Sequence, residues 1–191
     1  MDIETTGADE STPLHQASKK GQAEVVKFLL RQGANTETTC GADDATPLHD
    51  TSDERVLQLF LGPSHRANLE ARNELKQTPL HLAASQGRLE AAQMLLDGGV
   101  DMEATDSFGL TPLDQACYSG FVEVARLLLD RGAAIERKPN LETTPLYHAA
   151  GQGKTEVVWL LLCRYPWLVE RRSEYHDQDR KTKRRRIQYE P

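Results

Sequence analysis

Three absences in this sequence of 191 residues exclude several classes of protein. The three cysteines, Cys40, Cys117 and Cys163, are odd in number and lack paired spacing, which argues against a secreted disulfide scaffold. No apolar stretch approaches the roughly 18 residues of a membrane span, and no basic start followed by an apolar core stands at the N-terminus. We therefore expect a protein without membrane contact in a reducing, intracellular compartment, either cytoplasmic or nuclear.

What the sequence does contain is a short word that returns along the chain. It reads TPLH at Thr12, Thr46 and Thr78, TPLD at Thr111 and TPLY at Thr144. Successive threonines are 34, 32, 33 and 33 positions apart, and self-similarity at such a period is typical of a stacked repeat protein. In such a protein each unit touches only its neighbours, so the length of the chain predicts the number of repeats.

One copy, residues 78–110, shows why the pattern predicts a pair of helices. Thr78 suits an N-cap and Pro79 the first helical position, because proline has no backbone N–H to leave unbonded there. Gly87 supplies the left-handed residue that ends the first helix. Apolar residues at i, i+3 and i+4 spacings predict a second helix over 89–96. Three other copies carry the same inter-helix glycine: Gly21, Gly120 and Gly153.

This pattern resembles the ankyrin repeat. The resemblance covers roughly residues 2–170 and rests on five TPLH-like words in period with helix-ending glycines. It implies an all-α solenoid of five helix-turn-helix repeats with projecting β-hairpin fingers, and a concave face formed by the fingers and the first helices. We assign residues 1–170 to this array. The first finger is expected at 2–11 and the repeats are expected to start near 12, 46, 78, 111 and 144.

Two ladders of polar residues keep the same register. Glutamate recurs every 33 residues where the family usually has Asn, at Glu4, Glu37, Glu70, Glu103 and Glu136. We interpret these glutamates as braces between neighbouring fingers, with an acidic recognition stripe as the alternative. The fourth residue of the motif is histidine in three copies, His15, His49 and His81, where the resemblance implies an imidazole that hydrogen-bonds the neighbouring hairpin. Asp114 and Tyr147 replace it in repeats 4 and 5, which a set of metal ligands would not tolerate.

Repeat 2 is expected to be irregular. Thr46 to Glu70 spans 24 residues where the neighbours have 25, and the letters SDER at 52–55 replace the inter-helix glycine. We expect a truncated first helix and a bend or a loosening of the array here. Glu4 belongs to a finger whose own helices are missing, so we also expect the chain to begin in mid-repeat and to be a fragment of a larger multidomain protein.

The sequence does not predict a catalytic or a metal site. Neither GxxxxGKS nor GxxxxGKT nor a strand-linked GxGxxG occurs, so no phosphate-binding loop is indicated. Soft and hard ligands between Cys40 and Asp53 match no standard metal spacing. Cys117 and Cys163 are expected to pack in the core. We predict no cofactor, no metal and no catalytic residue, and an enzyme or enzyme subunit using the Cys40 to Asp53 region is the alternative.

The candidate binding residues lie at positions that the repeat leaves free, which the resemblance places in the concave groove. Apolar or aromatic side chains occur there in repeats 3 to 5, and we predict that they contact a partner protein: Leu75, Phe108, Leu110, Tyr118 and Leu141. Charged residues are predicted to set its register: Arg72, Glu74 and Lys138. His148 is a further candidate contact, with a plain surface residue as the alternative. Phe108 and Leu141 have packing on neighbouring fingers as their alternative.

The last residues, 171–191, form a basic tail on an acidic body. Eight Lys and Arg stand against four Asp and Glu, which gives the tail a charge of +4 and leaves −10 on residues 1–170. A run of basic residues dominates it: Arg180, Lys181, Lys183, Arg184, Arg185 and Arg186. An import signal, a contact with nucleic acid or an acidic partner, and a solvated tail all remain open.

Taken together, these observations predict a non-catalytic protein–protein interaction scaffold. We expect a monomer whose rigid groove is presented to a partner protein. Contact with nucleic acid or an acidic partner through the tail is the second alternative. The partner itself is not predicted, because repeat arrays of one geometry bind unrelated targets.

Overall fold

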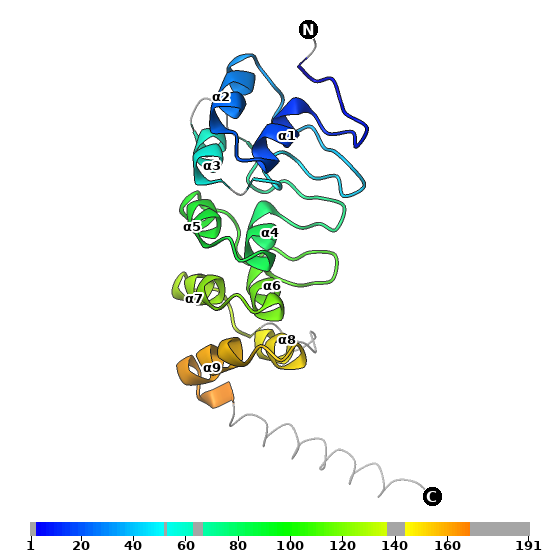
Figure 1. Cartoon of the computed structure of the whole chain (residues 1–191). Coiled ribbons are helices and arrows are strands. Elements are labelled where there is room, and N and C mark those ends of the chain that lie inside the picture. Colours follow the sequence, from blue (N-terminus) through cyan, green and yellow to red (C-terminus); the bar gives the residue numbers. More distant parts are fainter. Residues whose placement is uncertain (1–2, 52, 63–66, 137–143, 169–191) are drawn as a thin grey trace, which may run out of the picture.

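A computed structural model describes residues 3–51, 53–62, 67–136 and 144–168 of the chain, and in these residues the helices stack in two layers along one axis (Figure 1). The inner layer, beside the loops, holds α1 (Pro13–Lys19), α4 (Pro79–Ser85), α6 (Pro112–Ser119) and α8 (Pro145–Gly151). The outer layer holds α2 (Ala23–Arg31), α3 (Glu54–Leu61), α5 (Leu89–Asp97), α7 (Val122–Asp130) and α9 (Thr155–Arg164). This all-α solenoid confirms the predicted fold class.

The motif threonines and the glycines between the helices act as predicted. Thr12 is an extended N-cap with Pro13 in the first turn, and the Thr12 hydroxyl accepts a hydrogen bond from the backbone N–H of His15 at 3.4 Å. Thr111 caps α6 in the same way, and Thr78 is the extended N-cap residue of α4. Gly87, one residue beyond the C-cap of α4, has φ +71°, a conformation that side chains disfavour. The capping and reversal of each helix pair are therefore local properties of the sequence.

The hydrophobic core runs through the array from repeat to repeat. Apolar side chains from both layers are almost completely buried: Leu14, Leu80 and Leu113 on the inner helices, and Val26, Leu95, Leu128 and Leu161 on the outer helices. They belong to one cluster, in which each helix pair packs on the next. Short helices of seven to ten residues are marginal alone, so this packing between repeats stabilises them.

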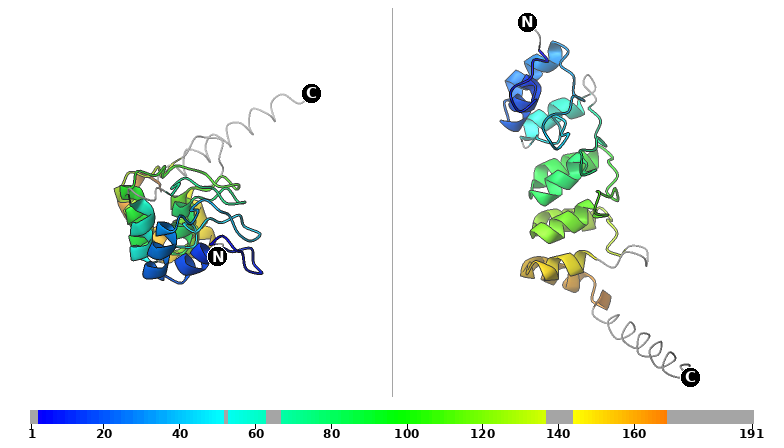
Figure 2. Two further views of the ribbon diagram at one scale, coloured as in Figure 1. Left: turned by 90° about the horizontal axis from the view of Figure 1, so that it is seen from above. Right: turned by 90° about the vertical axis from the view of Figure 1, so that its right-hand side faces the viewer.

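The loops project from one side of the stack as fingers, as Figure 2 shows from above. Within the described fingers, β pairing is limited to one antiparallel bridge, between Cys40 and Ala45. The tips are closed by backbone hydrogen bonds such as Asp106 N–H to the Leu110 carbonyl, at 2.9 Å. Neighbouring tips are also joined, because Ser107 N–H donates to the Leu75 carbonyl at 2.8 Å. The full hairpin geometry that the resemblance implies stays a prediction.

The glutamate ladder braces the fingers, which confirms the structural interpretation. Glu37 Oε1 accepts the backbone N–H of Asn68 at 2.9 Å, and Glu70 Oε1 accepts that of Asp101 at 2.7 Å. Glu103 Oε1 accepts the N–H of Ala134 at 2.8 Å. Each acceptor lies one repeat before its donor. A carboxylate that accepts a backbone N–H forms a charge-assisted bond, so every repeat fixes the entry to the next finger.

Removing one of these glutamate hydrogen bonds is expected to lower the free energy of unfolding by a small but measurable amount. Glu103→Ala should lower the free energy of unfolding by about 1 kcal/mol, because its hydrogen bond to Ala134 is exposed. Urea unfolding followed by circular dichroism measures the change. Glu74→Ala is the control, since Glu74 is also an exposed finger glutamate but contributes only its backbone N–H to the hydrogen bonds described here. Equal loss in both variants would contradict the bracing role.

Repeat 2 is irregular, as predicted. Residues 47–50 form a turn where the other repeats have a helix, and α3 is its only helix within residues 53–62. Repeat 3 supports this turn, because Arg88 Nη1 donates to the Thr51 carbonyl at 2.8 Å. A hydrogen bond from the neighbouring repeat therefore helps to hold this turn in place.

Candidate partner-binding groove

The finger of repeat 4 displays an aromatic side chain on a rigid turn. Phe108 is 70% exposed at its tip, and Leu75 occupies the equivalent place one finger earlier and is also exposed. Asp106 is buried beneath, and its Oδ1 accepts the backbone N–H groups of Phe108 and Leu110, both at 2.9 Å. Its Oδ2 accepts from the Gln115 amide at 2.9 Å, which ties the finger to α6. The turn is thus fixed before any partner arrives.

The inner helices add a second group of aromatic side chains. Tyr118 on α6 and Tyr147 on α8 both pack edge-on against His148, with ring centroids 6.4 Å and 5.8 Å apart. Both tyrosines are exposed, while His148 is half-buried between them. The His148 Nε2 atom is buried and has no hydrogen-bond partner among the described residues. We name Phe108, Tyr118, Tyr147 and His148 the aromatic cluster.

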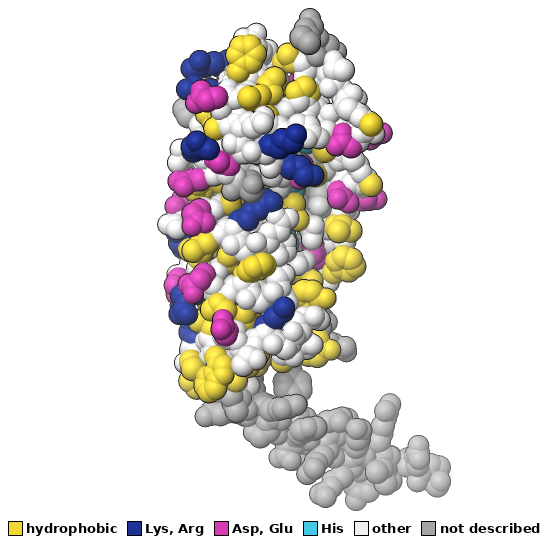
Figure 3. All heavy atoms as spheres, viewed as in Figure 1, with side chains coloured by type: hydrophobic (Ala, Val, Ile, Leu, Met, Phe, Trp, Pro, Cys, Tyr) yellow, Lys and Arg dark blue, Asp and Glu magenta, His cyan; other side chains and the backbone are white. Residues whose placement is uncertain are grey.

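The tips of the fingers carry mainly acidic side chains in the first repeats and mainly hydrophobic side chains further along the array. Figure 3 shows acidic side chains along the edge of the upper fingers and hydrophobic side chains concentrated below them. The exposed acids near the tips of the first three fingers are Asp9, Glu10, Asp43, Asp44 and Glu74. The side of the array that carries the fingers therefore has an acidic end toward the N-terminus and an aromatic end in repeats 4 and 5.

The other predicted site residues differ in their exposure and in their hydrogen bonds. Arg72 and Glu74 are exposed, but Arg72 Nη1 donates to the Thr105 carbonyl at 2.9 Å and so links two fingers. Leu110 is half-buried, and its carbonyl accepts from His81. The remaining candidates lie outside the described residues, and their roles stay predictions: Lys138, Leu141, Arg180, Lys181, Lys183, Arg184, Arg185 and Arg186.

The motif histidines are structural, in agreement with the prediction. Each ring Nδ1 accepts the backbone N–H of the motif threonine, so Nε2 carries the proton and donates to the next finger. The acceptors are the carbonyls of Ala45, Gln77 and Leu110, at 3.1, 3.0 and 3.1 Å from His15, His49 and His81 respectively. Burial lowers the pKa of all three imidazoles below their ordinary value.

Two of the three thiols, Cys40 and Cys117, have raised pKa values. Cys117 is buried as predicted, and burial raises the pKa of its thiol. Cys40 is half-buried, and burial together with the nearby Asp50 carboxylate raises its pKa. The prediction that Cys163 packs in the core was wrong. It is exposed because it lies one turn beyond Trp159 on the outer face of α9, at the position of Asp97 and Asp130 in the preceding repeats.

Metal and membrane sites find no support in the described part of the chain. No group of three or more His, Cys, Asp or Glu side chains in these residues is placed to hold a metal ion, including the region from Cys40 to Asp50. None of the helices there is both long and apolar enough to cross a bilayer.

Sequence reasoning missed two exposed aromatic residues on the outer helices. Trp159 on α9 and Phe28 on α2 are 63% and 61% exposed. A comparison between repeats carries a signal for the first, because Trp159 stands where the other outer helices have a polar residue: Lys27, Gln58, Gln93 and Arg126. Phe28 has apolar counterparts, so only the structure reveals its exposure.

Comparison with protein families agrees with this geometry. A model of the ankyrin repeat matches residues 9–39, and a model of three ankyrin repeat copies matches residues 50–139. No curated protein matches the chain. The two matches together cover more than half of the sequence, and their repeats are generally protein–protein interaction modules. The chain therefore belongs to the ankyrin repeat family.

Proposed function

We propose that this protein is a non-catalytic scaffold that binds a partner protein through the aromatic end of its concave groove. The observation that carries the proposal is the aromatic cluster, whose Phe108 and tyrosine rings stand exposed on the finger and the inner helices of repeats 4 and 5. Exposed aromatic side chains within a polar surface are typical of binding hot spots.

The mechanism is presentation of a preorganised surface. Asp106 fixes the turn that displays Phe108, His81 attaches the same finger to repeat 3, and the glutamate braces hold successive fingers together. Because these contacts exist in the free protein, little conformational entropy is lost on binding.

The proposed function of the groove is binding without catalysis. Nucleophilic catalysis needs a thiol or hydroxyl with an adjacent base, whereas the Cys40 and Cys117 thiols have raised pKa values and the motif imidazoles already bind backbone groups. Binding without catalysis is the function that these residues support best.

An affinity capture from the source cell tests the groove. The double variant Phe108→Ala, Tyr118→Ala should lose at least about 30-fold in affinity for a captured partner, because truncating one hot-spot residue costs about 2 kcal/mol or more. Trp159→Ala is the matched control, since it removes an equally exposed aromatic ring from the outer layer. Helicity by circular dichroism confirms that both variants fold.

Comparison with Trp159→Ala shows whether a loss of binding is specific to the groove. A partner captured by the native chain and by Trp159→Ala, but lost by the double variant, supports the groove. If the double variant captures the same partners with unchanged affinity, the groove is not the site, and the basic run from Arg180 to Arg186 becomes the surface to delete next.

A further inference from the structure

The inner layer of the array loses much of its apolar packing at repeat 2. Residues 47–50 form a turn there, so a loop occupies the inner layer between α1 and α4 (Figure 1). Within residues 47–51, Leu48 is the one residue that belongs to the hydrophobic core cluster. The equivalent segment of repeat 3, α4, contributes Leu80, Ala83 and Ala84 to that cluster. Repeat 2 therefore offers its neighbours a smaller apolar surface on this side.

On the outer side, two open cavities flank α3. The first has a volume of about 440 Å³ and lies between α2 and α3, with Val25 and Leu59 among its lining residues. The second has a volume of about 620 Å³ and lies between α3 and α5, and its lining includes Leu61 and Met94. Facing side chains make no van der Waals contact across spaces of this size. The packing that couples one repeat to the next is thus incomplete on both sides of α3.

Ion pairs between successive outer helices also change at repeat 2. Asp97 at the end of α5 pairs with Arg131 beyond α7 at 2.8 Å, and the next two outer helices repeat this contact. The ion pair at α3 instead joins Arg55 to Asp53 within the same repeat, and none links α3 to α2 or α5 in the part of the chain that the structure describes. Exposed ion pairs contribute little to stability, so the cavities and the missing inner helix matter more.

The buried face of α3 and a few hydrogen bonds still connect the two sides of repeat 2. Glu37 Oε1 accepts the Asn68 N–H at 2.9 Å between exposed residues, and Arg88 Nη1 donates to the Thr51 carbonyl at 2.8 Å. When such a bond breaks, both groups bond to water, so it contributes less than the burial of a large apolar side chain. In a repeat array the interfaces between neighbours hold the units together, and a weak interface lets them unfold separately.

We infer that repeat 2 is a joint at which the array divides into two units that unfold separately. The N-terminal unit contains α1 and α2, the C-terminal unit contains α4 to α9, and α3 lies between them. This inference rests on the packing around repeat 2 and is independent of the proposed function. Its consequence is that the acidic tips of the first two fingers and the aromatic cluster belong to different units. The aromatic cluster therefore keeps its structure when the N-terminal unit opens.

Native-state hydrogen exchange of the full chain, followed by mass spectrometry, tests this division with two buried leucines. Leu14 on α1 and Leu161 on α9 are both almost completely buried, and each lies two repeats away from α4. Leu14→Ala should speed the exchange of α2 by at least about 30-fold but leave α4 within about threefold of its native rate. Leu161→Ala is the matched control and should speed the exchange of α4 as well as α9, by at least about tenfold, because more complete interfaces join them.

The exchange rate of α4 distinguishes the possible arrangements. Faster exchange there in Leu161→Ala alone supports the joint. Equal acceleration of α4 in both variants means that the array unfolds as one unit, which overturns the inference. Unchanged exchange of α4 in both variants means that each repeat opens alone, and this result overturns it too.

A milder pair of variants keeps the test valid if the loss of a leucine unfolds the whole chain. Ala17 of α1 and Ala149 of α8 occupy the same position of the repeat motif, and both are buried. Glycine at either position weakens its helix by an amount that corresponds to about fivefold faster exchange. Ala17→Gly should show this factor in α1 and α2 but not in α4, whereas Ala149→Gly should show it in α4 as well. Equal acceleration of α4 by the two glycine variants overturns the joint.

Discussion

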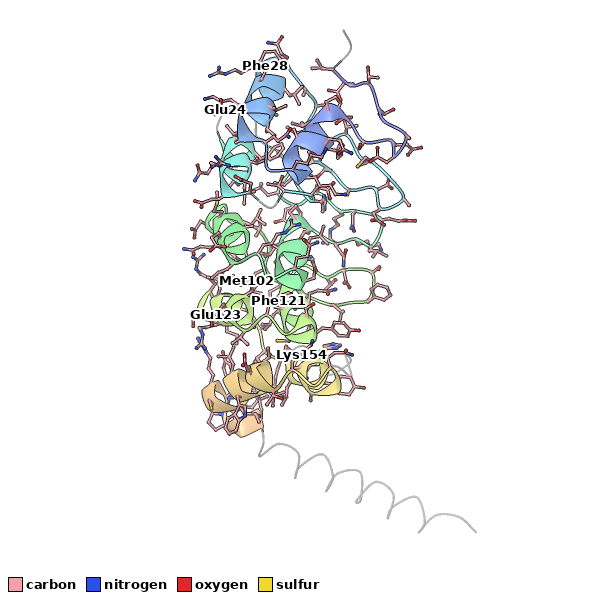
Figure 4. The ribbon with its side chains drawn as sticks, viewed as in Figure 1. Glu24, Phe28, Met102, Phe121, Glu123 and Lys154 are labelled. Carbon is pink, nitrogen blue, oxygen red and sulfur yellow. The ribbon has the colours of Figure 1, made fainter. Side chains whose placement is uncertain are left out.

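Gly87→Ala is expected to lower the free energy of unfolding by about 2–4 kcal/mol. Gly87 has φ +71°, which an L side chain adopts only with strain. A Cβ atom there would also lie 2.3 Å from Cδ1 of Phe121, well inside contact distance. Gly87 follows α4 and Phe121 precedes α7 of the next repeat, so the methyl group would force two repeats apart. Figure 4 labels Phe121 at the level of α6 and α7.

Gly99→Ala is the matched control for this experiment. Gly99 also has a positive φ, +81°, but nothing lies within 4 Å of its Cβ position. Its substitution carries the backbone strain alone, about 1 kcal/mol. Urea unfolding followed by circular dichroism compares the two variants with the native chain. In a Phe121→Ala background, Gly87→Ala should cost no more than Gly99→Ala does. Equal costs for the two glycines in the native background would contradict the clash.

The backbone turn at Gly87 and the steric clash of a Cβ atom there also show how far the sequence could predict the fold. The turn was predictable, because a helix-ending glycine in register with TPLH is a local pattern. The clash was not, because the contacting residue differs in each copy: Asp53 against Gly21, Phe121 against Gly87 and Lys154 against Gly120. Threonine caps, glutamate braces and motif histidines were equally predictable, since each joins positions that recur at the same spacing.

The candidate site was less predictable, because exposure depends on what covers each position. Phe108 and Tyr118 were found as apolar residues at free positions, and both are exposed. Phe28 was missed because its counterparts Met94 and Leu127 are also apolar, and only a preceding repeat distinguishes their burial. Cys163 was assigned to the core from an apolar helix, although its own position faces outward. Periodicity predicts which residues are equivalent, but neighbours decide which are covered.

Mild acid is expected to destabilise the array through three buried histidines. Each imidazole of His15, His49 and His81 is buried, and its pKa lies below the ordinary value of 6.5. The unfolded chain therefore takes up these protons first as the pH falls. The free energy of unfolding is fully present above pH 6.5 and decreases below it, with a limiting slope of about 4 kcal/mol per pH unit for three protons.

Urea unfolding at a series of pH values between about 7.5 and 5 measures this slope. His81→Gln is the comparison variant, because it removes one titrating group and should reduce the slope by about a third. The carboxyl groups of Asp9 and Asp53 have pKa values lowered from 3.8, so they act only at more acidic pH. A native chain whose stability is constant between pH 7.5 and 5 would show that the imidazoles protonate freely in the fold.

His81 also connects this pH dependence with the proposed binding surface. Burial lowers the pKa of His81. Nδ1 of His81 also accepts the Thr78 N–H at 3.1 Å, so it cannot take up a proton without losing that hydrogen bond. Protonation must break that bond, while Nε2 of the same ring holds the Leu110 carbonyl beside Phe108. The finger that displays Phe108 is thus attached through a ring whose own bond to Thr78 is lost in acid. Partner affinity should fall with stability in the wild type and less steeply in His81→Gln.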